Sequence, residues 1–156
     1  MSVQYVHPIE VVEDVANEEG WELERLEEDD LTFFLGDLQI AFTWLEDENA
    51  LHVACAFELE VPRERSAEVL ILTARINVHL WVGHLDAFLD DGHVSFRHAH
   101  LLQPGEDFTP AQCRRMVELA RRTCEQYSPA YYLVLRGMDP EQAFGSVQMG
   151  PTGTIQ

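Results

Sequence analysis

Histidines are the side chains in this sequence whose spacing could form a metal site. His98 and His100 are separated by one residue in a predicted strand, so their side chains face the same way. His79 and His84 lie where a predicted helix gives way to a strand. Two imidazoles on one face can begin a zinc site, but a structural site needs four ligands and a catalytic site usually three. No other Cys or His has a supporting spacing, so we expect exposed strand histidines and no metal or other cofactor.

One cysteine has the position of a reactive thiol. Cys113 stands at the start of a predicted helix, where the helix dipole lowers a thiol pKa, and Arg114 and Arg115 would add to that effect. Its spacing to Met116 and Val117 nevertheless places it on the apolar stripe of that helix. The other two cysteines also lie in apolar patterns, and none of the three belongs to a C-x-x-C pair. We therefore predict buried, reduced thiols.

The carboxylates are too numerous to mark an acid–base pair. Asp86, Asp90 and Asp91 lie near His84 and His93 and imitate the acid and base of a hydrolase. A general acid needs a perturbed pKa inside a cleft, which a sequence does not reveal. The sequence contains none of the motifs of nucleophile elbows, phosphate-binding loops, zinc-protease helices or dinucleotide folds. We predict that the protein is not an enzyme.

The charge of the chain is strongly negative. Ten cations, all of them arginine, face 28 acids and give a net charge of −18. Eleven of the acids fall between Glu10 and Asp30, where Arg25 is the one cation. Such a charge repels nucleic acids and anionic membranes and favours solubility and basic partners. The opening residues have no apolar signal-peptide core, and no apolar run approaches the length of a membrane span, so a cytoplasmic location is expected.

The elements that must position these groups begin with one helix and a run of strands. Pro8 suits the first turn of a helix and Gly20 its end, with apolar residues at helical spacing between them. Four segments then alternate apolar and polar residues and are separated by acidic or glycine-containing turns. The predictions are a helix at residues 8–19 and an antiparallel meander of strands at 21–26, 31–35, 38–44 and 51–59.

The second half of the chain predicts a helix, a hairpin and further helices. Gly83 ends a wide apolar stripe, and residues 90–92, Asp-Asp-Gly, are a strong hairpin signal. Residues 109–112 form a capping box, and Pro129 is expected to kink or restart the helix that follows. The predicted elements are a helix at 63–81, strands at 85–89 and 94–102, a long helix from 110 and a short helix from 140.

The order of elements is typical of an α+β fold. The order α-β-β-β(β)-α-β-β-α predicts an antiparallel sheet with helices packed on one side. At 156 residues, 46% of them hydrophobic, the chain suits one domain with a full core. The sequence has neither internal repeats nor a linker, so we predict a single domain over residues 1–149 and a frayed tail over 150–156.

Three tyrosines near the C-terminus are candidate contacts for a partner. Tyr127 precedes the segment 130–135, which contains Tyr131 and Tyr132 and is apolar on nearly all sides. A terminal helix usually keeps one face in water. This segment therefore fits either a partner or homodimer surface, or packing against the protein's own sheet.

Several blocks of the sequence resemble the YbjN-like family of bacterial proteins. The most specific are the block 77–83, with its Asn77, Leu80, Trp81 and Gly83, and the block Phe96-Arg97-His98. Segments 51–57, 124–130 and 139–143 are similar too, and the resemblance extends over residues 8–147. The family is described as a sensory transduction regulator. The resemblance implies a fold similar to type III secretion chaperones, which are small acidic proteins that bind polypeptides, often as homodimers.

Two functions follow as expectations. The first is a non-catalytic protein-binding, adaptor or chaperone-like module that is a homodimer and has a polypeptide partner. The alternative is a small-ligand sensor or an enzyme with a pocket at the most specific blocks. That pocket would be lined by Trp81, Phe96, Arg97 and His98. Structural roles for the same blocks are a turn at Gly83, a backbone contact of Asn77, and a pair between Arg97 and an acid such as Asp86.

Overall fold

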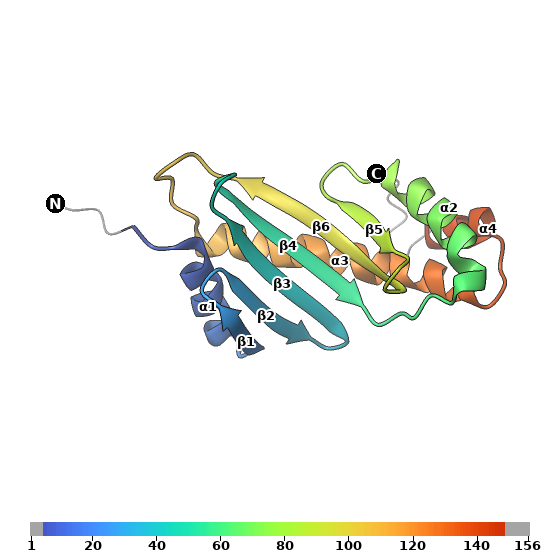
Figure 1. Cartoon of the computed structure of the whole chain (residues 1–156), viewed down its shortest axis with the longest axis horizontal. Coiled ribbons are helices and arrows are strands. Elements are labelled where there is room, and N and C mark those ends of the chain that lie inside the picture. The colour runs from blue at the N-terminus through green and yellow to red at the C-terminus, as the bar shows by residue number, and fades with distance from the viewer. Residues whose placement is uncertain (1–4, 149–156) are drawn as a thin grey trace.

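The computed structural model describes residues 5–148 and has an α+β architecture built on a six-stranded antiparallel sheet. The strands follow the order β1-β2-β3-β4-β6-β5, and the long helix α3 runs behind the sheet along its length (Figure 1). Helix α1 packs at one end of the molecule, and α2 and α4 pack at the other (Figure 1). The predicted frayed tail, residues 150–156, lies outside the described residues. None of the helices in residues 5–148 combines the length and hydrophobicity needed to span a bilayer.

The first four strands form the predicted meander. Alternation buries one face of it: Ile40 pairs with Cys55 and Phe42 with Val53, and all four side chains lie in the core. The opposite face carries mostly polar or small residues, with Phe34 and Leu45 as exposed apolar exceptions. The bounds are β1 (Glu22–Glu27), β2 (Asp30–Leu35), β3 (Leu38–Leu45) and β4 (Ala50–Phe57).

The hairpin of β5 (His84–Phe88) and β6 (His93–Leu101) completes the sheet, with β6 between β4 and β5. Strand β5 begins opposite Arg97, so residues 98–101 of β6 pair with β4 alone. The short β5 thus leaves a free length of β6 at this edge of the sheet.

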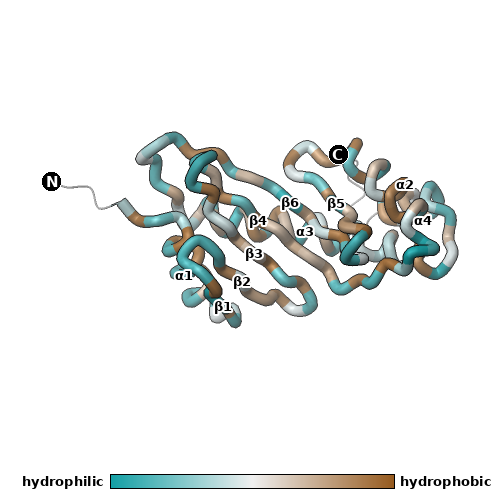
Figure 2. Tube along the Cα trace, in the orientation of Figure 1, coloured by the Kyte–Doolittle hydropathy of each residue, from teal (hydrophilic) through white to brown (hydrophobic). Residues whose placement is uncertain are grey.

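Helix α1 (Pro8–Glu19) has the predicted ends. The His7 side chain accepts a hydrogen bond from the backbone N–H of Ile9, and Gly20 closes the helix in the left-handed conformation, with φ 75°. Hydrophilic and hydrophobic residues alternate along this helix (Figure 2), and its apolar stripe is buried.

Helix α3 (Pro110–Leu135) is continuous through Pro129, which corrects the expected kink or restart. Residues on both sides of the proline, including Tyr127, Ala130 and Tyr131, are buried on one stripe and hold the helix in line. Pro129 itself faces solvent, where water can bind the carbonyl left without a partner. The helix begins with the predicted capping box of Thr109 and Gln112.

The predicted helix over 63–81 is shorter in the structure. Residues 63–65 form a 3-10 turn, and α2 is Ser66–Asn77. The side chain of Asn77 explains the early end, because its Nδ2 donates to Leu85 O at 2.9 Å and its Oδ1 accepts from Leu85 N at 2.8 Å. These bonds tie the last residue of the helix to β5 and confirm the expected backbone contact of Asn77. Helix α4 (Pro140–Gln148) then packs on α2 and α3.

Tyr131→Phe is expected to lower the free energy of unfolding by about 1–2 kcal/mol. The hydroxyls of Tyr131 and Thr73 lie 2.7 Å apart in the core, and Thr73 donates its own proton to Val69 O at 2.8 Å. Tyr131 is therefore the donor to Thr73, and phenylalanine would leave a buried oxygen with one partner fewer. Urea unfolding measures the loss.

Tyr132→Phe is the matched control for this prediction. Its hydroxyl, on the same helix, donates to Glu58 O at 2.6 Å at the exposed surface. Water can replace that contact, so the expected loss is below about 0.5 kcal/mol. Equal losses in the two variants would show that the buried hydroxyl pair does not stabilise the core.

Candidate functional site

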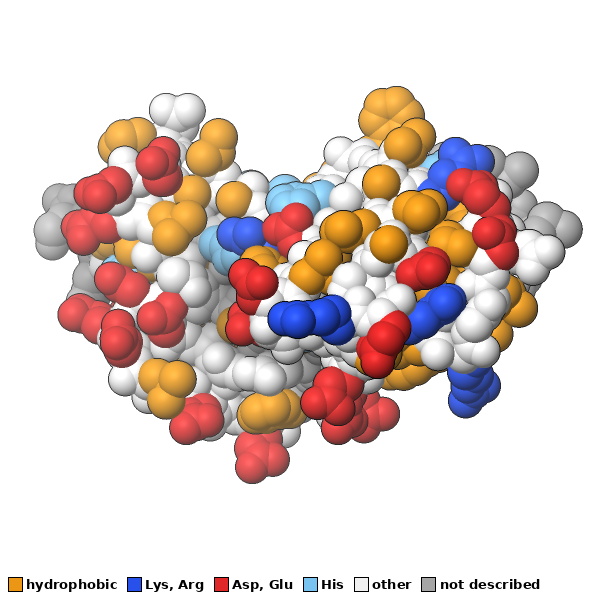
Figure 3. Space-filling model, turned by 45° about the vertical axis from the view of Figure 1, so that its right-hand side comes forward, with side chains coloured by type: hydrophobic (Ala, Val, Ile, Leu, Met, Phe, Trp, Pro, Cys, Tyr) orange, Lys and Arg blue, Asp and Glu red, His pale blue; other side chains and the backbone are white. Residues whose placement is uncertain are grey.

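An open hollow lies where β5 stops short of the end of β6. Its volume is about 430 Å³, and strands β3 to β6 and the turn before β5 supply its walls. Figure 3 shows a notch between two lobes of the molecule, with histidine and arginine side chains together on its floor. The lining residues are Leu45, His52, Gly83, His84, Arg97, His98 and Ala99.

A chain of polar contacts crosses the open face of the sheet beside this hollow. Arg97 donates from Nε to His52 Nε2 at 3.1 Å and from Nη1 to Asp86 Oδ2 at 3.0 Å. The same carboxylate oxygen accepts from His84 Nε2 at 3.2 Å. The expected pair of Arg97 with Asp86 is confirmed. Because the guanidinium is only a donor, its bond to His52 Nε2 fixes the neutral imidazole with its proton on Nδ1.

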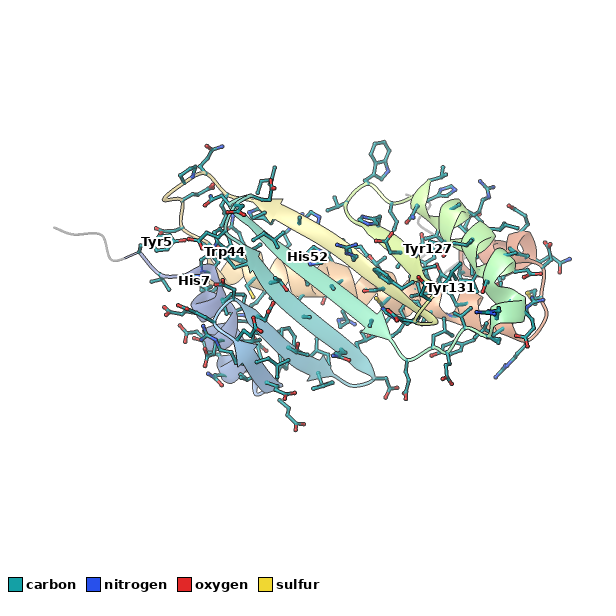
Figure 4. The ribbon with its side chains drawn as sticks, in the orientation of Figure 1. Tyr5, His7, Trp44, His52, Tyr127 and Tyr131 are labelled. Carbon is teal, nitrogen blue, oxygen red and sulfur yellow. The ribbon has the colours of Figure 1, made fainter. Side chains whose placement is uncertain are left out.

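Two histidines of the hollow are held in their neutral form. Burial is the largest effect on His52 and lowers its pKa, and the neighbouring charges of Arg97, His84 and His98 lower it further. Burial also lowers the pKa of His98, followed by the effects of His100 and His84. Figure 4 places His52 on β4 at the middle of the sheet. At pH 7 these imidazoles therefore offer hydrogen bonds without positive charge.

The described residues do not bring together a metal site. Within residues 5–148, no group of three or more His, Cys, Asp or Glu side chains has the geometry to hold a metal ion. His98 and His100 do face the same side of β6, opposite Val53 and Leu51, and both are half-buried, which corrects the expectation of exposed histidines. Their i, i+2 spacing places two imidazoles on one face and supplies no third ligand.

Cys113 is buried within α3 and is not activated. Burial raises the pKa of its thiol to about 12, and the nearby Arg114 lowers it by a smaller amount. A side-chain hydrogen bond with Cys55, followed by burial, also raises the pKa of Cys124. The free thiols are buried core groups, as the apolar spacing predicted.

The four residues of the predicted small-ligand pocket do not converge. Arg97 and His98 line the hollow, but Phe96 is fully buried, and Trp81 is 89% exposed on the loop before β5. The ring of Phe96 packs directly under Gly83. The pocket is therefore formed by polar groups from β4, β5 and β6, and the aromatic lining is a wrong expectation. Sequence reasoning missed His52, because its pairing with β6 is fixed only by the sheet.

Two of the three candidate tyrosines are also core residues. Tyr127 and Tyr131 lie along α3 behind the sheet (Figure 4) and are 6% and 0% exposed. The tilted contact of Tyr131 with Phe57 shows that α3 packs on the protein's own sheet. This burial excludes both as partner contacts of the folded chain. Tyr132 remains half-exposed.

A group of exposed apolar side chains lies on α2 and the loop after it, while others, such as Leu26 and Leu101, are exposed elsewhere. Buried residues of α2 occupy one stripe, and a second set of apolar side chains faces solvent, with Val78 75% exposed. Hydrophobic side chains gather on the lobe of α2, on the right of the notch in Figure 3. We call this set the α2 stripe. It consists of Leu70, Ile71, Val78, Trp81 and Val82. The sequence signal for it was an apolar segment wider than one buried face requires.

A second, smaller hollow lies between the end of α1, Trp21 just before β1, the end of β2, and α3. Its volume is about 330 Å³. Trp21 stacks on Phe33 beside it at 4.7 Å between ring centroids. Arg114 crosses one rim and donates to Glu19 Oε1 at 3.1 Å and to Glu18 Oε2 at 2.7 Å. The acid-rich segment 10–30 supplies Glu19 and Trp21 to the lining, and α3 supplies Glu118 together with Arg114 and Arg121.

Comparisons with known proteins agree with this architecture. Residues 8–142 match the model of the family YbjN, described as "Putative bacterial sensory transduction regulator". No curated protein matches the sequence. Three solved structures share the fold at low sequence identity.

A chain of the ExsC–ExsE complex has 13% identity and a TM-score of 0.53, with 83% of this chain and 92% of that chain covered. YbjN from E. coli has 11% identity and a TM-score of 0.56, over 81% and 87% of the two chains. A chain of the HopA1–SchA chaperone–effector complex has 11% identity and a TM-score of 0.51, over 75% and 92%. The fold is therefore the predicted type III secretion chaperone-like α+β fold, and the match over residues 8–142 shows that the chain belongs to the YbjN family.

Proposed function

We propose that this protein is a non-catalytic, chaperone-like or regulatory protein-binding module that works in the cytoplasm as a homodimer and holds a polypeptide partner. The α2 stripe carries this proposal. A contiguous row of exposed apolar side chains is rare on a soluble monomer unless another protein covers it. Here it belongs to a chain with a net charge of −18.

A second copy of the chain is the occupant that charge favours for the α2 stripe. Two molecules of charge −18 repel each other over most of their surface. The segment 63–83 is different, because it contains three arginines (Arg63, Arg65, Arg75) and two glutamates (Glu64, Glu68), which give +1. Two copies can therefore meet here with little repulsion. An exposed helix face also suits the self-complementary contact of a two-fold dimer.

The polypeptide partner is expected at the other end of the molecule. The edge strand β1 exposes the acids Glu22, Glu24 and Glu27, and it begins directly after Trp21, which lines the second hollow. Such a surface attracts a basic segment, and the hollow beside Trp21 offers an apolar floor for one of its side chains. A partner and a second copy would then bind without competition. Structures of similar fold support a polypeptide partner, since one of them is a chain of a chaperone–effector complex.

Charge-dependent capture from a native cell lysate tests the partner proposal. The bait is the full chain, and the test variant is Glu22→Gln/Glu24→Gln/Glu27→Gln. A polypeptide that the native chain retains should be lost from this variant by a factor of about ten or more, because three surface charges steer and hold it. Mass spectrometry of the eluates measures the ratio.

The matched control removes three charges from an exposed turn elsewhere, with Glu46→Gln/Asp47→Asn/Glu48→Gln. It should capture the same polypeptide as the native chain. If none of the three baits captures a polypeptide, or if both variants lose it equally, β1 is not the partner surface.

A further inference from the structure

The hollow between β4, β5 and β6 lacks the negative charge that dominates the rest of the chain. Of 156 residues, 28 are Asp or Glu, yet none of the seven residues that line the hollow is acidic. Three are histidines and one is Arg97. A hollow of about 430 Å³ is within the range of small-molecule sites. The size of the hollow and its basic lining residues distinguish it from the proposed protein-binding surfaces at α2 and β1.

We propose that this hollow binds the oxyanion group, phosphate or carboxylate, of a small molecule, with Arg97 and His52 as the donors. The inference goes beyond protein binding and uses none of the residues of the α2 stripe. It assigns a ligand class to the notch in Figure 3.

The donors that the hollow offers are not used up within the described residues. Arg97 uses Nε for His52 and Nη1 for Asp86, and its Nη2 bonds to no residue in 5–148. The bond from Arg97 leaves His52 with its proton on Nδ1, which is a second donor. A guanidinium whose free N–H groups face a hollow is a common way to hold phosphate or carboxylate.

Asp86 limits the charge of the free site. This carboxylate balances the charge of Arg97, so at pH 7 the free hollow is close to neutral. His52 cannot gain a proton on Nε2 without breaking its bond from Arg97, so it would hold an oxyanion as a neutral donor. The side chain of His98 pairs across from the buried Val53 and therefore lies on the opposite face of β6.

Titration of the full chain with sodium sulfate and with sodium phosphate, followed by NMR of the arginine Nε–H and histidine ring signals, tests the proposal. The signals of Arg97 and His52 should move and saturate, with a Kd on the order of a few millimolar for these bare ions. Sodium chloride at the same ionic strength should leave these signals in place.

Two variants with the same charge change separate a site from general electrostatics. Arg97→Gln should weaken sulfate binding at least tenfold. Arg122→Gln, on an exposed position of α3, should leave it unchanged. Arg97→Lys keeps the charge and should recover part of the affinity, which guards against a mere folding defect in Arg97→Gln. Equal shifts with chloride, or full affinity in Arg97→Gln, would overturn the proposal.

A hexapeptide of glutamate provides the last arm. If the peptide binds more than tenfold tighter than sulfate and moves signals well outside the hollow, the ligand is an acidic polypeptide, and the small-molecule assignment is wrong. If it binds no better than sulfate, the small-molecule assignment stands.

Discussion

Gly83→Ala should destabilise the protein by about 3 kcal/mol, the largest loss we expect from adding a single methyl group. Gly83 has φ +72°, a backbone conformation that disfavours every other residue. A Cβ at this position would also lie 2.6 Å from Cε2 of Phe96 and 2.9 Å from the carbonyl oxygen of Arg97. The carbonyl belongs to the sheet and the ring to the core, so neither can move without disturbing its neighbours. Urea unfolding of the variant measures the loss.

Gly105→Ala separates the two contributions to this loss. Gly105 has nearly the same backbone conformation, with φ +80°, but a Cβ there would meet nothing within 4 Å. Its substitution should therefore show only the backbone strain, about 1 kcal/mol. The difference between the two variants is the close approach of the β5 turn to Phe96. If both variants lose the same stability, the turn has room for a side chain, and the packing argument for Gly83 is wrong.

The close approach at Gly83 also explains why the sequence predicted a turn at this position and yet misjudged Phe96. A glycine before a strand indicates a turn, and that much needs no tertiary structure. The ring of Phe96 in β6 lies under this turn because Phe96 pairs with Leu85 of β5. Phe96 alternates with Arg97 across the sheet, so one residue is buried and the other reaches the hollow. The register of the hairpin, which the sequence does not specify, makes that choice.

The fold itself was largely predictable, because its elements have local signals. The capping box at Thr109, the glycine at the end of α1 and the alternation in the meander each act within a few residues. The hollow had no such signal, and the α2 stripe was indicated only by an apolar segment wider than one buried face requires. His52 meets Arg97 from 45 positions away in the chain. In the sequence, the second apolar face of α2 resembles part of a longer core helix, because the bonds of Asn77 to Leu85 that end the helix are tertiary contacts.

Val78→Asp should convert the proposed homodimer into a monomer, with the dimer Kd rising about a thousandfold. Val78 belongs to the α2 stripe and is 75% exposed in one chain, so aspartate should change the free energy of unfolding of that chain by less than about 0.5 kcal/mol. In a two-fold dimer the substitution occurs twice, and each buried, unpaired carboxylate costs about 2 kcal/mol. Light scattering over a range of concentrations measures the mass, which should fall from twice 17.9 kDa to 17.9 kDa.

Leu26→Asp makes the comparison specific to the α2 stripe. Leu26 is 71% exposed on β1, at the opposite edge of the sheet, so the same kind of change is made on an equally open apolar residue. The dimer should persist in this variant, because β1 is assigned to the polypeptide partner and not to the second copy. If the native chain is already monomeric at micromolar concentration, no second copy covers the α2 stripe, and the homodimer proposal is wrong. Dissociation by Leu26→Asp but not by Val78→Asp would move the dimer contact to β1, where the acids of two copies would have to face each other. Because that arrangement brings like charges together while the segment 63–83 carries +1, the charge distribution of the chain favours the α2 stripe.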